Sequence, residues 1–206
     1  LPAQRTHPLR PKGIIAVDLF GLPADYKKIN RIAAENDLFV IEDAAQSFGA
    51  EMDGRKTCSL ATIGCTSFFP AKPLGGYGNG GMCFTSDPNM AGAMQSIRVH
   101  GKGSDQYDNI RIGINGRLDT LQAAILLAKF EIFPKEVQLR NAVADRYSKL
   151  LRGHNHLTTP AVPPGYRSVW AQYSLITQSP ENRTLYQEAL KAKNIPSAVY
   201  YPKPLH

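Results

Sequence analysis

The chain has 206 residues, of which 43% are hydrophobic and 20% charged, as is ordinary for a globular protein with one large domain or a domain and part of a second. No stretch approaches the roughly 20 consecutive apolar residues of a membrane-spanning helix, and residues 1–12 lack the apolar stretch of a signal peptide, so we expect no membrane partner. The formal net charge is +7, but Lys and Arg are scattered without a run that alternates with aromatics, which argues against a nucleic-acid partner and leaves a solvated surface or an anionic small-molecule ligand.

The first part of the chain predicts a βαβ unit. Residues 13–20 form a short apolar run that indicates a buried strand. Residues 24–36 carry apolar side chains at helical spacing. Residues 38–41 are a second buried strand, which leads into an acidic pair ending at Asp43. A strand, a helix and a strand at this spacing predict a parallel sheet with a right-handed crossover.

The middle of the chain predicts short strands and longer helices around a loop rich in glycine and proline. The loop covers residues 70–81, and short strands are expected on both sides of it, at 66–69 and 81–85. Three helices are expected to follow, over residues 90–99, 118–130 and 135–151.

The pattern changes after Arg152, where several prolines form a linker-like stretch. A strand, a helix and a strand are expected after it, over residues 171–176, 184–193 and 195–201. We predict that residues 1–134 are part of a large domain, and that residues 135–206 are an interdomain helix and part of a smaller C-terminal α+β domain. The sequence ends without a closing element, so the chain is expected to be a fragment.

The three cysteines, Cys58, Cys65 and Cys83, lack a CxxC motif or other zinc spacing, so no metal site is expected. Their odd number and apolar neighbours are typical of free, reduced thiols in a cytoplasmic protein. No motif pairs one of them with a histidine, so none is expected to be a catalytic nucleophile.

Asp43 is a candidate ligand-binding residue because it lies where a buried parallel strand ends. Ligands of open α/β sheets bind outside those carboxyl ends. Burial alone would favour the neutral acid, whereas a cationic partner such as a protonated pyridine nitrogen would favour the carboxylate. An ordinary turn or helix-capping aspartate would occupy the same position, so both interpretations stay open on this residue alone.

Lys72 is a candidate nucleophile because it lies between Pro70 and Pro73, just after a strand and before a glycine-dense loop. Glycines let backbone approach a ligand closely, and Ser67 supplies a hydroxyl group just upstream. An amine that reacts with an aldehyde and a hydroxyl that binds phosphate suit a cofactor carrying both groups, such as pyridoxal 5'-phosphate (PLP). A purely structural glycine-rich turn is the alternative.

Five motifs in matching order resemble the nucleotide-sugar aminotransferases of PLP fold type I, the DegT/StrS-like family. The resemblance extends from about residue 13 to the end of the chain. The motifs are VIEDAAQ at residues 40–46, SFFPAK at 67–72, GINGRLDTLQAA at 113–124, VWAQY at 169–173 and VYYPKPLH at 199–206. The implied fold is α/β, with the mostly parallel sheet of the large domain and part of the smaller C-terminal domain.

The resemblance implies a role for each matched residue near the cofactor. Asp43 would bind the pyridine nitrogen of PLP and Gln46 would lie against its ring. Ser67 would hold the phosphate. Lys72 would form the Schiff base with the cofactor and later carry the proton of the transfer step.

The resemblance also implies residues that act between subunits. Asn115 would reach the phosphate of the cofactor in the neighbouring subunit, and Arg117 the substrate there, so a homodimer is implied. Tyr200 and Tyr201 match positions that contact the sugar nucleotide. Aromatic residues of a buried strand are the alternative for this tyrosine pair.

This sequence departs from the family pattern in two ways. Asn79 stands in the lysine loop where the family commonly has an acidic residue, at a position without a chemical role. No counterpart of the family's first third, which brings a further phosphate-binding turn, is visible. A sheet without its first strands would expose unpaired edges, so the isolated chain is expected to be inactive or partnered.

The implied function is transfer of an amino group, with glutamate as donor, to a keto-sugar attached to a nucleotide, in surface polysaccharide or amino-sugar biosynthesis. A dehydratase of the same family would carry histidine in place of Lys72, which argues against that variant. A noncatalytic PLP-binding or regulatory relative on the same scaffold stays open. A plain nucleotide-binding domain is weakened because neither a P-loop nor GxGxxG follows the first strand.

Overall fold

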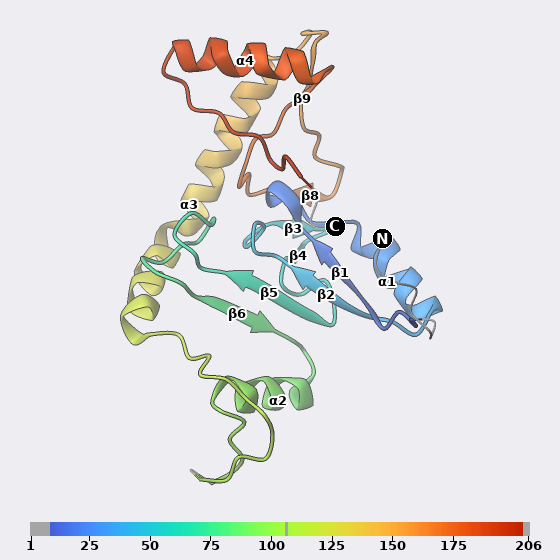
Figure 1. Ribbon diagram of the computed structural model, residues 1–206, viewed down its shortest axis with the longest axis vertical. Coiled ribbons are helices and arrows are strands. Elements are labelled where there is room, and N and C mark those ends of the chain that lie inside the picture. The colour runs from blue at the N-terminus through green and yellow to red at the C-terminus, as the bar shows by residue number, and fades with distance from the viewer. Residues whose placement is uncertain (1–8, 106, 204–206) are drawn as a thin grey trace.

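The computed structural model describes residues 9–105 and 107–203, and its centre is a four-stranded sheet with the order β1-β2-β5-β6 (Figure 1). Strands β1, β2 and β5 pair in parallel, whereas β6 pairs antiparallel with β5. The predicted parallel sheet is therefore confirmed for its first three strands. The strands are β1 (Gly13–Val17), β2 (Phe39–Asp43), β5 (Ile63–Ser67) and β6 (Gly81–Phe84).

Helix α1 (Tyr26–Glu35) is the predicted crossover between β1 and β2, and it covers one face of the sheet. Asp25 caps it by accepting a hydrogen bond from the backbone N–H of Lys28. Alternate strand residues point toward the helix. Strand residues of this face, helix residues and their neighbours form one buried cluster, which comprises Ala16, Tyr26, Ala33, Val40, Met52 and Leu60.

The opposite face of the sheet carries apolar side chains that no described element covers. Ile15 on the edge strand β1 is 68% exposed, and Val17 and Phe39 are 47% and 50% exposed. Asp43 pairs in register with Val17, so its side chain belongs to this same face. The exposed edge and face agree with the expectation of an incompletely covered sheet.

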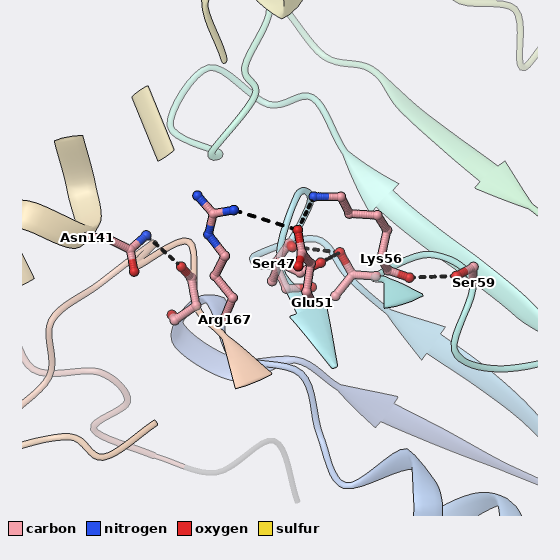
Figure 2. A network of polar contacts seen from close by, with 9 residues as sticks. Ser47, Glu51, Lys56, Ser59, Asn141 and Arg167 are labelled. Carbon is pink, nitrogen blue, oxygen red and sulfur yellow. Dashed lines mark hydrogen bonds and ion pairs between the residues drawn. The ribbon is translucent and has the colours of Figure 1, made fainter. Parts of the chain in front are cut away.

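A second, small sheet and a strand pair consist of two-residue strands that the sequence did not predict, because so short a stretch shows no periodicity. The small sheet has the order β4-β3-β8, and β7 pairs with β9. Glu51 on β3 lies between Lys56 and Arg167 of the two neighbouring strands, as Figure 2 shows. The strands are β3 (Glu51–Met52), β4 (Arg55–Lys56), β7 (Leu157–Thr158), β8 (Tyr166–Arg167) and β9 (Ile176–Thr177).

The two helices expected on either side of Pro134 form one helix, α3 (Thr120–Leu150). A proline inside a helix costs about 3 kcal/mol or more. However, Leu126, Phe133 and Val137 on both sides of it are buried in one core cluster. Each such burial contributes about 1.5–3 kcal/mol, so the sum outweighs the penalty and the helix continues. The shorter helix α2 (Pro88–Arg98) begins two residues before the expected start at residue 90, because Asp87 caps it and a proline is tolerated in its first turn.

The C-terminal part contains the expected helix, α4 (Pro180–Ala192), but not the two expected strands. In the range 171–176 only Ile176 belongs to a strand, and residues 195–201 form none. The backbone N–H of Gln172 donates to the carbonyl oxygen of Phe20 at 3.3 Å, so this stretch bonds to a loop instead of to a sheet. A strand needs a paired neighbour, and residues 195–201 have none among the residues described.

No helix in the described part of the chain combines the length and the apolar character that crossing a membrane requires.

Candidate active site

Three parallel strands, β1, β2 and β5, end at the same edge of the main sheet, and the residues with candidate chemistry follow them there. Asp43 pairs in register with Cys65, and Ser67 lies two residues further along β5. Since alternate residues of a strand share a face, Asp43 and Ser67 lie on the same face of adjacent strands. The predicted position of Asp43 at the carboxyl end of a parallel strand is confirmed. The strand expected at residues 66–69 lies earlier in the chain, as β5, because residues 63–65 pair with β2, so Ser67 stands at the end of its strand and not near its beginning.

Asp43 forms the turn expected of an ordinary aspartate and keeps one carboxylate oxygen for a ligand. Its side chain is half-buried, and Oδ1 accepts a hydrogen bond from the backbone N–H of Ala45 at 3.0 Å. No hydrogen bond to Oδ2 is found within residues 9–105 and 107–203. The two interpretations left open by the sequence are therefore compatible, because one oxygen serves the turn and the other is available to a cation.

The loop that carries Lys72 folds back on its own backbone. The N–H of Lys72 donates to the carbonyl oxygen of Phe69 at 2.9 Å, and its side chain is half-buried. A Cβ atom on Gly75 would lie only 2.5 Å from the carbonyl oxygen of Pro70. Gly75 is therefore required by close packing of the loop itself, and this packing fixes the position of the lysine.

The hydroxyl of Ser67 retains its proton for a ligand. Its Oγ accepts a hydrogen bond from the backbone N–H of Phe69 at 3.2 Å. An accepting hydroxyl oxygen can still donate its own hydrogen. Ser67 can thus donate to an anionic group such as a phosphate at the end of β5.

Two residues of α3 that the sequence analysis did not single out hold this loop. Gln122 accepts a hydrogen bond from the backbone N–H of Tyr77 at 2.7 Å. Lys129 donates to the carbonyl oxygen of Gly75, and its Nζ lies 5.7 Å from the centre of the Tyr77 ring. The sequence pattern that could have identified them is their spacing of two helical turns, which places both polar side chains on one side of an apolar helix.

Both the oxygen and the nitrogen of the Gln46 side-chain amide form hydrogen bonds within this chain. Its Oε1 accepts from the backbone N–H of Phe20 at 2.7 Å, and its Nε2 donates to the hydroxyl of Tyr201 at 2.8 Å. Tyr200 and Tyr201 are about half exposed, with their rings 5.4 Å apart. The alternative of buried strand aromatics is therefore wrong for this pair, and the structure places Tyr201 beside Gln46 of the same chain. Residues 204–206 of the last motif lie outside the described residues.

Asn115 and Arg117 are not brought to this edge of the sheet. Both are exposed, and the Nε of Arg117 donates to Oδ1 of Asn115 at 3.2 Å. They lie on the segment after α2, which projects away from the main sheet in Figure 1. This placement leaves their predicted role at a neighbouring subunit as a prediction.

The motif at residues 169–173 joins α3 to the loop after β1. Asn141 of α3 donates to the backbone oxygen of Ser168 at 3.0 Å (Figure 2). Its Oδ1 accepts from the indole N–H of Trp170 at 3.2 Å. The N–H of Val169 donates to the carbonyl oxygen of Gly21 at 3.0 Å. The motif therefore holds α3 and the loop after β1 together through hydrogen bonds.

Asp18 is a fully buried carboxyl group directly behind Asp43. It accepts hydrogen bonds from the hydroxyls of Tyr26 at 2.8 Å and Ser47 at 2.7 Å. Its backbone N–H donates to the carbonyl oxygen of Asp43 at 3.0 Å. Burial raises the pKa of Asp18, and these hydrogen bonds offset part of that rise. Asp18 therefore fixes the backbone from which Asp43 extends.

Glu42 is the second buried acid, on the sheet face opposite Asp43. Its two oxygens accept backbone hydrogen bonds from Cys58 at 2.6 Å and Leu60 at 2.8 Å. Burial raises the pKa of Glu42 to about 7, because neither hydrogen bond compensates fully for the lost solvation of the charge. Glu42 therefore anchors the turn after β4 and changes its charge near neutral pH.

Replacing Glu42 with glutamine is expected to remove a pH dependence of stability. The raised pKa means that the neutral acid stabilises the fold fully below about pH 4.5, and this contribution is lost as the pH rises through about 7. The free energy of unfolding of the wild type, relative to Glu42→Gln, should fall by up to about 3 kcal/mol between about pH 5 and pH 8. Urea unfolding at each pH measures this difference.

Glu35→Gln on the exposed side of α1 is the matched control for removing one carboxyl group outside the core. A difference for Glu42→Gln that stays constant from pH 5 to pH 8 would contradict the assignment of a raised pKa to Glu42.

The residues at this edge fit the chemistry of PLP, which no part of the structure contains. Asp43 offers a carboxylate oxygen to a protonated ring nitrogen, and Ser67 a hydroxyl hydrogen to a phosphate. Lys72 offers an amine to an aldehyde carbon. The acid and the hydroxyl come from the ends of two neighbouring strands, and the amine comes from the loop that follows the second of them, so the chain offers a complementary group for each of the three groups of this ligand.

Comparison with known proteins agrees with this chemistry. The model of the DegT/DnrJ/EryC1/StrS aminotransferase family matches residues 3–206. Over 197 residues the chain is 50% identical to the UDP-2-acetamido-2-deoxy-3-oxo-D-glucuronate aminotransferase of Pseudomonas aeruginosa, a match that covers 96% of this chain and 54% of that protein. It is 40% identical over 197 residues to the UDP-N-acetyl-3-dehydro-alpha-D-glucosamine 3-aminotransferase of Acidithiobacillus ferrooxidans, covering 96% of this chain and 52% of that one.

Among solved structures, the chain resembles a DegT DnrJ EryC1 StrS aminotransferase from Brucella abortus, with a TM-score of 0.91 and 50% identity over 96% of this chain and 52% of the other. The chain thus spans about half the length of the curated relatives it matches. The predicted fold class, PLP fold type I with a mostly parallel sheet, is confirmed by this likeness.

Proposed function

The chain belongs to the DegT/DnrJ/EryC1/StrS aminotransferase family, and on this premise we propose that the whole protein is a PLP-dependent aminotransferase that moves an amino group from glutamate to a nucleotide-linked keto-sugar. The observation that carries the proposal is the meeting of Asp43 and Ser67 on one face of adjacent strand ends, with the Lys72 loop directly following. The proposed setting is amino-sugar or surface polysaccharide biosynthesis in the cytoplasm.

PLP, when bound, supplies an electron sink that stabilises negative charge on the substrate carbon as its proton leaves. Asp43 would keep the ring nitrogen protonated by placing a carboxylate oxygen against it. Ser67 would orient the phosphate. Lys72 would hold the cofactor through its ε-amine and, once released by the incoming amine, carry a proton between the two carbon atoms involved in the transfer.

The two relatives suggest the substrate class. Both are named for UDP-linked sugars with an oxo group at carbon 3. We propose that this protein takes a UDP-linked 3-keto-sugar. Amination of a panel of UDP- and dTDP-linked keto-sugars, with glutamate as donor, tests this choice. If glutamate neither changes the absorbance of the bound cofactor nor supports amination of any sugar, the regulatory alternative takes the place of this proposal.

The domain division stays a proposal. Residues 1–134 would belong to the PLP-binding large domain and residues 135–206 to the interdomain helix and the small domain. Helix α3 runs through this boundary, and it contacts the lysine loop through Gln122 and the segment before Tyr173 through Asn141. It would therefore connect the site to the small domain as one rigid element.

We propose that the working unit is a homodimer in which Asn115 and Arg117 reach the neighbouring site. The segment that carries them is apolar as well as exposed, with Ile112 at 96% and Ile114 at 62% exposed. Exposed isoleucines beside polar residues are typical of an interface. An isologous interface would present this segment of each subunit to the other.

Subunit mixing is expected to reveal the shared site. Lys72→Ala and Arg117→Ala proteins should each be inactive, whereas their co-expression should restore about a quarter of wild-type activity, since half of the dimers are mixed and each mixed dimer has one intact site. The wild type co-expressed with the double variant is the control, because every mixed dimer then has two defective sites. Activity near one half in this control, or a fully active monomer in light scattering, would contradict the shared site.

A further inference from the structure

Cys65 and Cys83 face each other across the antiparallel pair β5–β6. They are direct partners in the register, and their Sγ atoms lie 3.7 Å apart. The N–H of Phe68 donates to the carbonyl oxygen of Gly80, which marks that position as a hydrogen-bonded pair. Since hydrogen-bonded and non-hydrogen-bonded pairs alternate, the two cysteines occupy a non-hydrogen-bonded pair, where side chains approach most closely.

The geometry of this pair suits a covalent bond. Disulfides need Cα atoms about 4.4–6.8 Å apart, and residues of a non-hydrogen-bonded pair lie about 4.5 Å apart. Cys83 is exposed and Cys65 half-buried, so one thiol is open to a reagent and the other is within reach of it. Cys58 differs from both, because it is buried and lies in the turn held by Glu42.

We propose that Cys65 and Cys83 are an oxidation site at which a reversible disulfide links β5 to β6. The pair shares a sheet face with the candidate active site, since Cys65 is in register with Asp43 and lies two residues before Ser67. The bond would tie together the two strands that flank the Lys72 loop, and it goes beyond the proposed function because it does not depend on amino transfer.

The reaction balances with a disulfide such as oxidised glutathione as oxidant. The thiolate of the exposed Cys83 attacks one glutathione sulfur and releases the first glutathione thiolate, which takes up the proton that Cys83 lost. Cys65 then attacks the sulfur of Cys83, forms the Cys65–Cys83 bond and releases the second glutathione as a thiol. The two cysteines lose two electrons and two protons, and both pass to the two glutathiones.

Burial, together with the neighbouring Cys83, raises the pKa of the Cys65 thiol to about 12. Only the thiolate attacks a disulfide, so the second step should be slow at neutral pH. Its rate should increase about tenfold per pH unit between roughly pH 7 and pH 9, in proportion to the thiolate fraction.

The test is oxidation of the purified protein with oxidised glutathione, followed by alkylation of the remaining thiols, digestion and mass spectrometry. The expected product is a single linked peptide pair that joins Cys65 to Cys83, with Cys58 alkylated, and it should disappear after treatment with a reductant. Cys58→Ser is the matched control and should form the same link. Alkylation of both Cys65 and Cys83 after oxidation would overturn the proposal.

The variants Cys83→Ser and Cys83→Ala test whether the disulfide partner of Cys65 is Cys83 and not another cysteine. Position 83 is exposed, so either substitution leaves the core unchanged. Both variants should form no intramolecular disulfide. A link between Cys58 and Cys65 in these variants at the wild-type rate, or a glutathione that stays on Cys83 of the wild type without being displaced at pH 9, would refute the direct pairing.

Discussion

Lys72→Ala is expected to abolish amino transfer in the whole protein. The backbone of the loop that carries this lysine is fixed by the hydrogen bond to Phe69, by the close packing of Gly75 and by Lys129 of α3, whose own amine is bound to the carbonyl oxygen of Gly75. Loss of a proton carrier alone costs about 10²–10⁴ in rate, and loss of covalent attachment adds to it. Turnover with glutamate and the visible absorbance of the bound cofactor should both disappear.

Lys27→Ala is the control for this experiment, because Lys27 lies on the surface in an ion pair with Asp53 at 2.7 Å. It should keep wild-type turnover. The folded state of both variants is checked by circular dichroism, so that a loss of activity in Lys72→Ala reflects chemistry. Wild-type turnover in Lys72→Ala would remove this residue from the active site.

Asp43→Asn is expected to slow amino transfer by about 10²–10⁴, which corresponds to about 3–5 kcal/mol. The amide oxygen of asparagine can still accept the hydrogen bond from the N–H of Ala45 that Asp43 accepts at 3.0 Å. The turn is therefore preserved, while the negative charge that would keep the ring nitrogen protonated is lost. Single-turnover kinetics with glutamate measure the chemical step apart from binding.

Asp43→Ala separates the two roles of this side chain. It loses the charge and also the acceptor for the Ala45 N–H, so its rate should match that of Asp43→Asn while its free energy of unfolding is lower by about 1 kcal/mol. A rate for Asp43→Asn within about threefold of wild type would show that the charge does not contribute to the chemistry, and Asp43 would then be a turn residue alone.

The sequence by itself determined the elements whose signal is local. The strands predicted from the short apolar runs at 13–20 and 38–41 are confirmed by β1 and β2, and the helix predicted from the apolar spacing between them is confirmed by α1. The position of Asp43 at a strand end follows from the same signal, because its strand ends where the apolar run does. The end of β5 at Ser67 did not follow from it, because the apolar residues Phe68 and Phe69 placed the predicted strand at 66–69. A parallel βαβ unit then brings the ends of β1 and β2 to one edge of the sheet without further information.

The strand bounds in the C-terminal part could not be predicted, because a strand exists only with a neighbour to pair with. Residues 195–201 have the composition of a strand, yet the described structure provides no edge beside them. Likewise, Pro134 suggests a helix end, yet α3 continues because Phe133 and Val137 are buried against residues far away in the sequence.

The contacts that complete the candidate site also depend on long-range partners. Gln46 meets Tyr201, and the lysine loop meets Gln122 and Lys129, across separations that no periodicity connects. The pairing of Cys65 with Cys83 depends on the register of an antiparallel pair, where a shift of one residue would turn the side chains to opposite faces. The local pattern thus determined which residues stand at strand ends, and the tertiary structure decided which side chains touch them, because contact requires the packing of the whole chain.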